Sequence, residues 1–430
     1  MRAHLINNLN HVNNPNLHIG MIDYFNSDIL IICQKKKSYC EQNIFGVQSV
    51  CTLCKHKSKL LIQKINKIKK IIVIADEKPK KNYLIDRSTE KSIMLSIEST
   101  LASYFFTSNL DKIKPNLFKI KNQLFKDAIN YYFSFLSILD ENNIKSIVVY
   151  NGRYIIGKAL IEAAKKLRID YYVFDQKLSN SIIYFKNNLI HNISEKNKIA
   201  YDFYKANKIK ADKLANEIYK NKQLGVSTYE RSYIKDQKQG LFLKYFAKKI
   251  VNKKIIAIFP STDHEFFYLS DAWSGLVNQC NEIDQLSKKF IDSKDLIFIV
   301  RMHPNMASSA FFDLKSYSSL KNNRNVFVLM PNSKFSTYEI LNESYLSIFF
   351  CSSLACEAVI ANRNCITIGP SSFLDLKVCK NFSSFEDVNP YLNYKDYLNF
   401  DGASAFYYYL SVFNMYKGQR IKWDSKKDYY

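Results

Sequence analysis

The sequence lacks any apolar run close to the length that a membrane span requires. A spanning helix needs about 20 apolar residues, whereas the apolar runs here, such as residues 71–75, are soon interrupted by charge. The first eight residues are rich in Asn and His and have neither the apolar core nor the small-residue cleavage site of a signal peptide. We therefore expect a cytoplasmic protein without a membrane-spanning helix.

The sequence also lacks a disulfide framework, because nine cysteines in 430 residues show no dense, regular spacing. Four of them lie in one short stretch and include a Cys-x-x-Cys pair, as a structural zinc or iron–sulfur site would require. The unusual spacing of the first pair and the position of Cys33 at the end of a predicted strand favour buried thiols without a metal, and a structural metal stays open as the alternative. The four are Cys33, Cys40, Cys51 and Cys54. The five predicted to be buried thiols are Cys280, Cys351, Cys356, Cys365 and Cys379.

A concentrated basic patch is missing too, although the net charge is +23. Lys is spread along the whole chain beside abundant Asn, Ile, Tyr and Phe, a bias typical of AT-rich coding sequence. Basic clusters with interleaved aromatics of the RNA-binding type are absent, so no nucleic-acid partner is expected. The positive field that remains favours phosphorylated donors, anionic glycans and peripheral contact with the inner membrane surface.

What the sequence does contain is a series of short apolar runs typical of buried parallel strands. A helical pattern at 157–167 lies between two of them, which indicates a βαβ unit. The Lys-rich, helical residues 197–253 predict a connection between two domains, 1–250 and 251–430, with terminal helices after about residue 382. The fold class predicted is α/β with two Rossmann-like lobes and a central cleft. The predicted strands are 29–32, 71–74, 146–150 and 170–174, then 254–260, 296–301, 326–329, 346–350 and 365–369.

Ligands of open α/β sheets bind beyond the carboxyl ends of the strands, and three such segments of the second domain carry polar side chains. After the strand ending at residue 300 come Arg301, His303, Pro304 and Asn305. Pro304 pre-sets the turn, so that Arg301 and His303 stand where a phosphate can be gripped. The alternative is a plain strand-to-helix turn in which His303 caps or packs locally.

The second segment holds Ser352 and Ser353, which follow the strand 346–350 and open a helix. Two hydroxyl groups at a helix start offer donors to a phosphate. Glu357, one turn further on, can accept hydrogen bonds from a ribose. The alternative is that the serines only cap the helix and that Glu357 is a solvated first-turn carboxylate.

The third segment follows the first strand of this domain and contains Asp263, His264 and Glu265. A carboxylate here can deprotonate an acceptor hydroxyl. Because alternate residues of an extended segment point apart, one carboxylate faces the ligand; Asp263 and Glu265 rank equally and His264 third. No Asp-x-Asp motif follows a strand, so neither a metal nor another cofactor is expected, and Arg301, His303 and a helix dipole offset leaving-group charge.

Together with residues 336–341 and Gly369-Pro370, these three segments resemble bacterial capsule polysaccharide biosynthesis glycosyltransferases, relatives of the Kdo- and sialyl-type transferases. The resemblance implies a GT-B fold and transfer of a sugar from a nucleotide donor, a CMP-sugar among the candidates, to a capsule or other surface glycan, free or lipid-linked. It implies phosphate contacts from His303, Ser352 and Ser353 and a base at Asp263 or Glu265. Domain 1–250 then receives the acceptor and domain 251–430 binds the nucleotide.

In the first domain, Asn151, Gly152 and Arg153 follow the strand 146–150 and resemble a segment that such proteins carry at the mouth of the acceptor lobe. Gly152 permits a tight turn, and Arg153 can hold an anionic acceptor. Two rival functions remain open at this point. One is transfer of a polyol phosphate, as in teichoic-acid-like polymerases, and the other is a non-catalytic basic scaffold or nucleic-acid-binding protein.

Overall fold

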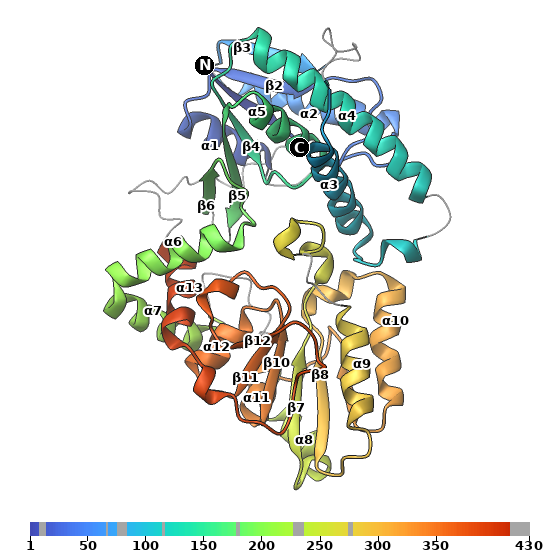
Figure 1. Ribbon diagram of the computed structural model, residues 1–430, viewed down its shortest axis with the longest axis vertical. Coiled ribbons are helices and arrows are strands. Elements are labelled where there is room, and N and C mark those ends of the chain that lie inside the picture. Colours follow the sequence, from blue (N-terminus) through green and yellow to red (C-terminus); the bar gives the residue numbers. More distant parts are fainter. Residues whose placement is uncertain are drawn as a thin grey trace. The chain divides into compact units, whose positions relative to one another are not determined.

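A computed structural model shows a chain that divides into two compact units (Figure 1). It describes residues 1–7, 14–65, 68–74, 84–113, 117–177, 181–226, 236–273 and 278–412. Within these ranges the first unit comprises residues 1–104 and 109–190, and the second comprises 105–108 and 191–412. Each unit is built on a sheet of six strands.

The sheet of the first unit has the order β3-β2-β1-β4-β5-β6, in which all neighbours are parallel except the antiparallel pair β5 and β6. This is the strand order of the dinucleotide-binding fold. The strands are β1 Arg2–Ile6, β2 Ile29–Cys33, β3 Lys70–Ile74, β4 Ser146–Tyr150, β5 Asp170–Lys177 and β6 Ser181–Lys186. The helices are α1 Asn14–Tyr24, α2 Gln48–Gln63, α3 Arg87–Phe105, α4 Leu117–Glu141 and α5 Ile155–Lys166.

All four strands predicted for the first half are present, as is the helix predicted at 157–167. The sequence did not indicate β1, which lies at the centre of the sheet between β2 and β4. His4 interrupts its apolar pattern, yet the side chain is fully buried. Its Nε2 lies 2.8 Å from Nδ1 of His18 on α1, and Nε2 of His18 lies 2.8 Å from the carbonyl oxygen of Asn7.

The buried histidine pair predicts that acid destabilises the first unit. Burial lowers the pKa of His18 to about 4 and that of His4 well below its ordinary value of 6.5. Since each folded-state pKa is depressed, the unfolded chain binds more protons below pH 6.5, and stability falls as the pH drops from 6.5 towards 4. His18 alone should account for about 3 kcal/mol over that window.

Urea titrations at several pH values between 7.5 and 4.5 would measure this slope. His18→Gln should make the free energy of unfolding less dependent on pH, whereas replacement of the exposed His56 by Gln should leave the dependence unchanged. An identical slope for the wild type and His18→Gln would contradict the assignment.

The sheet of the second unit has the order β12-β11-β10-β7-β8-β9 and is entirely parallel. Renumbered from β7, this order repeats that of the first unit. The strands are β7 Lys254–Phe259, β8 Leu296–Arg301, β9 Val326–Leu329, β10 Leu346–Phe350, β11 Cys365–Ile368 and β12 Lys380–Phe382. The helices are α6 Ile193–Ala206, α7 Lys208–Gln223, α8 Leu241–Ile250, α9 Gln279–Lys289, α10 Phe311–Ser319, α11 Thr337–Glu343, α12 Leu354–Ile360 and α13 Phe400–Val412.

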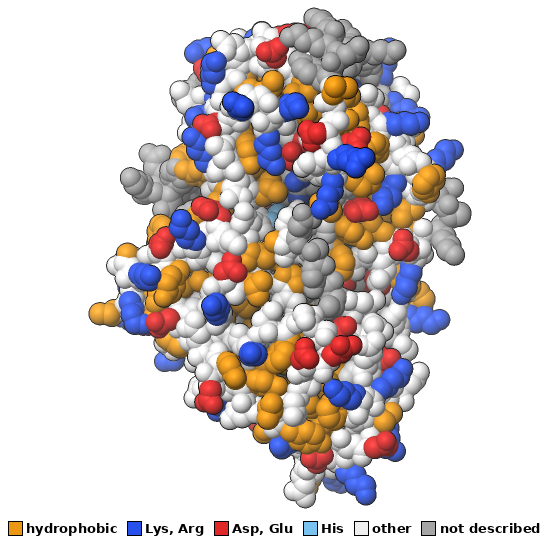
Figure 2. Space-filling model, in the orientation of Figure 1, with side chains coloured by type: hydrophobic (Ala, Val, Ile, Leu, Met, Phe, Trp, Pro, Cys, Tyr) orange, Lys and Arg blue, Asp and Glu red, His pale blue; other side chains and the backbone are white. Residues whose placement is uncertain are grey.

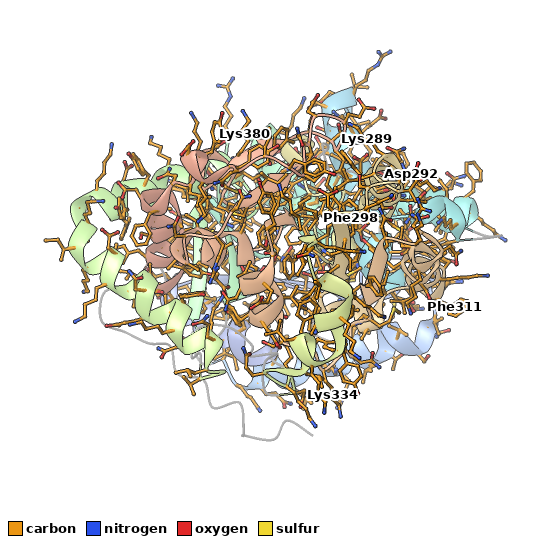
Figure 3. All side chains as sticks on the ribbon, turned by 90° about the horizontal axis from the view of Figure 1, so that it is seen from below. Lys289, Asp292, Phe298, Phe311, Lys334 and Lys380 are labelled. Atoms are coloured by element: carbon orange, nitrogen blue, oxygen red, sulfur yellow. The ribbon has the colours of Figure 1, made fainter. Side chains whose placement is uncertain are left out.

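The five strands predicted for the second half are confirmed, and with them the α/β class with two Rossmann-like lobes. Helices cover both faces of the parallel sheet, so its central strands are buried along their whole length. Figure 3 shows Phe298 of β8 inside this unit and Phe311 at its periphery; their exposed fractions are 0% and 79%. Ile283 and Leu286 of α9 pack in the same cluster as Phe298.

The helices predicted to connect the domains belong to the second unit. α6 and α7 pack on α13, and α7 also packs on α12, so the chain passes between the units at residues 190 and 191 rather than near residue 250. The predicted helical character of 197–253 is present in α6, α7 and α8, with residues 227–235 outside the described part. α13 accounts for a terminal helix, and residues 413–430 lie outside the description.

Four of the five C-terminal cysteines are buried and Cys280 is half-buried. In the described ranges no group of three His, Cys, Asp or Glu side chains could hold a metal ion, the four clustered cysteines of the first unit included. Burial raises the pKa of the Cys33, Cys40 and Cys54 thiols. No helix in those ranges is long and apolar enough to cross a membrane. Figure 2 shows Lys and Arg scattered over the visible face among acidic and apolar side chains.

Candidate functional site

The polar segments of the second unit lie at the switch point of its sheet. β7 and β10 are neighbours at the centre, and from them the chain winds outward to opposite edges. Val300 of β8 is level with Ile258 of β7, and Phe349 of β10 is level with Phe259. The ends of β8, β7 and β10 therefore form one row, and two strand spacings of about 4.8 Å put the outer two about 10 Å apart.

His303 follows β8 and caps the short 3-10 helix Pro304–Ser308. Its Nδ1 accepts a hydrogen bond of 3.1 Å from the backbone N–H of Asn305. Burial, aided by the nearby Arg301 charge, lowers the pKa of His303 to about 4. The ring is therefore neutral at pH 7 with its proton on Nε2, and it can donate a hydrogen bond to a phosphate oxygen. His303 can therefore cap the turn through Nδ1, as the alternative interpretation expected, and still serve as a donor through Nε2.

The side chain of Arg301 makes hydrogen bonds inside the second unit. Its guanidinium donates to the carbonyl oxygens of Met302, Met330 and Ser333 at 3.0, 3.0 and 3.1 Å. The residue is only 3% exposed, and burial lowers its pKa to about 10. Instead of reaching outward, this side chain ties the turn after β8 to the loop after β9 and so helps to hold His303 in place.

Ser352 and Ser353 are half-buried and follow β10 through Cys351, a non-glycine residue in the left-handed region with φ 53°. That backbone conformation costs roughly 1–2 kcal/mol and turns the chain sharply at the strand end. Ser352 Oγ accepts from the N–H of Leu354 at 3.3 Å, and the carbonyls of Ser352 and Ser353 accept from Ala355 and Cys356. The two serines thus form the first turn leading into α12, as predicted.

Glu357 lies inside the unit. One carboxylate oxygen accepts from Lys222 Nζ at 2.7 Å and from the Tyr407 hydroxyl at 2.8 Å, while the other accepts from the Tyr338 hydroxyl. Glu357 is 3% exposed and Lys222 is 8% exposed. The carboxylate predicted to contact a ribose is therefore committed to a buried ion pair that joins α7, α11, α12 and α13.

Asp263 opens a 3-10 turn directly after β7. Its Oδ2 accepts a hydrogen bond of 2.7 Å from Ser108, whose segment belongs to this unit. Burial raises the pKa of Asp263 to about 6, the nearby Asp313 charge adds to this rise, and the Ser108 hydrogen bond opposes it. A carboxylate with its pKa near the working pH suits a general base.

The two neighbours of Asp263 differ from it. Glu265 is exposed, while His264 is buried at 5% exposure with its ring 5.6 Å from that of Phe106 in an edge-on contact. The segment is a 3-10 turn and not the extended stretch that the expected alternation of side chains assumed, and the turn gives the three side chains different environments. Of the two carboxylates that ranked equally in the sequence, Asp263 has the environment of a base.

Residues 336–341 contribute structure rather than an open site. Ser336 caps α11 by accepting from the N–H of Glu339 at 3.2 Å. Glu339, 3% exposed, accepts from the backbone N–H groups of Phe242 and Leu243 at the start of α8, at 3.3 and 3.1 Å.

Three polar residues near the strand ends were missed by the sequence analysis. Ser108 is one; it is distant in sequence from Asp263 and carries no local motif. Ser261 and Ser371 follow β7 and β11, are 6% and 1% exposed, and their hydroxyl groups have no hydrogen-bond partner among the described residues. Buried hydroxyls without a partner are uncommon, and both lie in loops at the same edge of the sheet.

Lys196 is a further residue that the sequence did not single out. It lies in the first turn of α6, is half-buried, and interacts electrostatically with the Cys351 thiol at the end of β10. The region around it is rich in Lys, and no local feature of the sequence distinguishes Lys196 from the exposed Lys198.

In the first unit, Asn151 and Gly152 follow β4 with φ 58° and 74°. The positive φ of Gly152 is strained for any other residue, and an added Cβ would also lie 2.9 Å from Ile161 Cδ1, so this position favours glycine. Asn151 donates to Asp175 at 2.6 Å, and Arg153 donates to the Ser103 hydroxyl at 3.0 Å and stacks on Tyr154. The tight turn predicted at Gly152 is confirmed, and an acceptor contact by Arg153 stays a prediction.

The equivalent helix start in the first unit is already occupied by an internal carboxylate. Glu41 accepts from the backbone N–H of Ile156 in the first turn of α5 at 3.1 Å. Burial raises the pKa of Glu41. The second unit differs at the corresponding place, where the helix after β10 begins with serines.

Comparisons with solved structures return distant likenesses. The Thermosulfurimonas dismutans KpsC beta-Kdo 2,4-transferase is 12% identical, with 61% of this chain and 78% of that chain covered and a TM-score of 0.40. UDP-GlcNAc 2-epimerases from Methanocaldococcus jannaschii and Neisseria meningitidis are 11% and 10% identical, with TM-scores of 0.29 and 0.26. Both alignments cover 96% of this chain, and 99% and 100% of the respective epimerases.

No protein-family model and no curated protein sequence matches the chain. Identities and TM-scores this low carry nothing about reaction or ligand, so the assignment of function rests on this chain's own residues.

Proposed function

We propose that the protein is a glycosyltransferase that moves a sugar from a nucleotide-activated donor to a capsule or other surface glycan. The observation that carries the proposal is the row of side chains beyond β8, β7 and β10. It combines a neutral histidine donor at His303, a carboxylate with its pKa near 6 at Asp263, and the Ser352 and Ser353 hydroxyls. Donors for a phosphate on either side of a base are what sugar transfer from a nucleotide requires.

The nucleotide is proposed to bind the second unit. Its phosphate accepts hydrogen bonds from Nε2–H of His303 and from the hydroxyls of Ser352 and Ser353. The adjoining loops hold the hydroxyls of Ser261 and Ser371, for which the described part of the chain offers no partner. In the first unit, Glu41 already occupies the start of α5, which disfavours a second phosphate there. That unit is proposed to receive the acceptor, with Asn151, Gly152 and Arg153 at the end of β4.

The chemical step follows from these roles. The Asp263 carboxylate takes the proton of the acceptor hydroxyl, whose oxygen bonds to the anomeric carbon. The bond from that carbon to the phosphate oxygen breaks, and its electron pair leaves with the nucleotide. Hydrogen bonds from His303 and the serines offset the charge that develops on the phosphate, so this chemistry requires no metal or other cofactor. A single displacement of this kind inverts the anomeric carbon.

A thermal-shift screen tests the proposal. Purified protein is heated with CMP, UDP, GDP or CDP, with sugar nucleotides, or with a CDP-polyol. A ligand at 100 times its Kd should stabilise the protein by about 2.7 kcal/mol. His303→Ala and the double variant Ser352→Ala/Ser353→Ala should lose this stabilisation, while the control Ser319→Ala, an exposed serine on α10, should keep it.

Two outcomes would overturn the proposal. If no nucleotide stabilised the protein, or if the three substitutions left the shift unchanged, the strand ends would not form a nucleotide site. Stabilisation by a CDP-polyol but by no sugar nucleotide would instead favour transfer of a polyol phosphate.

A further inference from the structure

The first turn of α6 lies against the loops that follow β10 and β11. Ile193 packs in an apolar cluster with Cys351, Leu269 and Trp273. Asn197 donates from Nδ2 to the carbonyl oxygen of Ser372 at 2.8 Å, and its Oδ1 accepts from the N–H of Leu376 at 3.1 Å. Residues three and four apart share one face of a helix, so Lys196 lies on the side of α6 that faces these loops.

Lys196 has no ion-pair or hydrogen-bond partner in the part of the chain that the structure describes. Within the described residues its charge interacts with the thiol of Cys351, and burial keeps that thiol neutral by raising its pKa. Lys222 differs in both respects, because it is more deeply buried than the half-buried Lys196, at 8% exposure, and it bonds to Glu357 at 2.7 Å. A half-buried ammonium group without a counter-charge is less favourable than a paired one, and a bound anion would stabilise it.

The residues that follow Cys351 are Ser352 and Ser353, the hydroxyls assigned above to the donor phosphate. A lysine beside such a loop acts as a point charge on a phosphate. Ser371, whose hydroxyl has no partner within the described ranges, is adjacent in sequence to Ser372, whose carbonyl accepts from Asn197. The surroundings of Lys196 therefore contain hydrogen-bond donors, and the charge of Glu265 also reaches the Cys351 thiol beside it.

We propose that Lys196 is the cationic contact for the phosphate of the nucleotide at the end of β10. The proposal rests on the function proposed above and adds to it the residue that supplies the positive charge, since Arg301 is committed to backbone carbonyls. In the free protein, burial lowers the pKa of Lys196 to about 8, which agrees with a site that is completed by an anion.

Calorimetric titrations compare CMP, UDP, GDP and CDP with the phosphate-free nucleosides cytidine, uridine and guanosine. Lys196→Met should weaken binding of the nucleotide that binds the wild type by about 10- to 100-fold, as expected for loss of a charged hydrogen bond, and leave the matching nucleoside unaffected. Lys196→Arg should recover most of the affinity. Lys198→Met, on the exposed side of the same helix, is the matched control and should bind like the wild type.

The melting temperature of the free protein provides a second measurement. Removing a half-buried, unpaired charge should leave this temperature unchanged or raise it, and that result would show that weaker nucleotide binding by Lys196→Met does not come from a damaged fold. If the wild type binds a nucleotide through His303 and the serines but Lys196→Met binds it equally well, this inference is overturned while the proposed function stands. If the wild type binds none of the nucleotides, both are overturned.

Discussion

Replacing Asp263 by Asn is expected to lower kcat for sugar transfer by roughly 100- to 10,000-fold, the range that a general base contributes. The measurement uses the sugar nucleotide that stabilises the protein in the thermal screen. Asn has nearly the same shape and can still accept from Ser108, but it cannot take a proton from the acceptor hydroxyl. Donor affinity should therefore change little, which separates loss of the base from loss of binding.

The pH dependence of kcat/KM gives an independent readout of the same carboxylate. Because the pKa of Asp263 is raised to about 6, the base is protonated below that pH, and activity should fall about tenfold per pH unit on the acid side. The Ser108 hydrogen bond holds this pKa down, so Ser108→Ala should move the acid limb of the profile to higher pH. Ser108 is a positioning residue in this scheme.

Glu265→Gln is the matched control, since it removes an exposed carboxylate two residues away. It should retain most of the wild-type kcat. Full activity in Asp263→Asn together with a large loss in Glu265→Gln would transfer the role of base to Glu265. If Ser108→Ala did not move the acid limb, the pH profile would not report the titration of Asp263.

Lys222→Met should destabilise the second unit by about 3–5 kcal/mol, the usual cost of leaving one partner of a buried ion pair without the other. The Glu357 carboxylate would remain buried with only the Tyr338 and Tyr407 hydroxyls as partners. Urea unfolding followed by circular dichroism at pH 7 measures the change. The control Lys220→Met, an exposed residue on the same helix, should stay within about 0.5 kcal/mol of the wild type.

The double variant Lys222→Met/Glu357→Gln should be more stable than the sum of the two single losses predicts, because it removes both charges together. The single variant Glu357→Gln, measured for both nucleotide affinity and stability, also decides between two roles for Glu357. A carboxylate that bonds to a ribose would show a large loss of nucleotide affinity in Glu357→Gln with little change in stability, whereas the buried cluster predicts the reverse.

The sequence predicted the strands well where parallel strands are buried on both faces. Runs such as 254–259 and 296–300 are apolar at nearly every position, and such runs have few other stable places in a soluble domain. The same reasoning failed for β1, since His4 broke the apolar run. Burial of that histidine depends on His18, which lies on another element, and no local pattern reports a partner 14 residues away.

For the candidate site, local sequence indicated which segments follow strands but not how their side chains are used. His303 and the serines lie at strand ends as predicted. Arg301 and Glu357 also follow strands in the sequence. In the structure, however, Arg301 bonds to backbone carbonyls and Glu357 pairs with Lys222. Lys196 and Ser108 come from distant segments, and their relevance depends on contacts with Cys351 and Asp263 that no spacing rule encodes.

By itself the sequence determined the two α/β lobes and the three segments beyond β7, β8 and β10, because apolar periodicity and strand-end position are local properties of the chain. Only the tertiary structure decided which charges are paired. Lys196 and Lys222 are the same kind of residue in the same Lys-rich region. Packing of α6 and α7 bonded Lys222 to Glu357 and gave Lys196 no such partner among the residues that the structure describes. Pairing depends on distances between elements, which no short stretch of sequence contains.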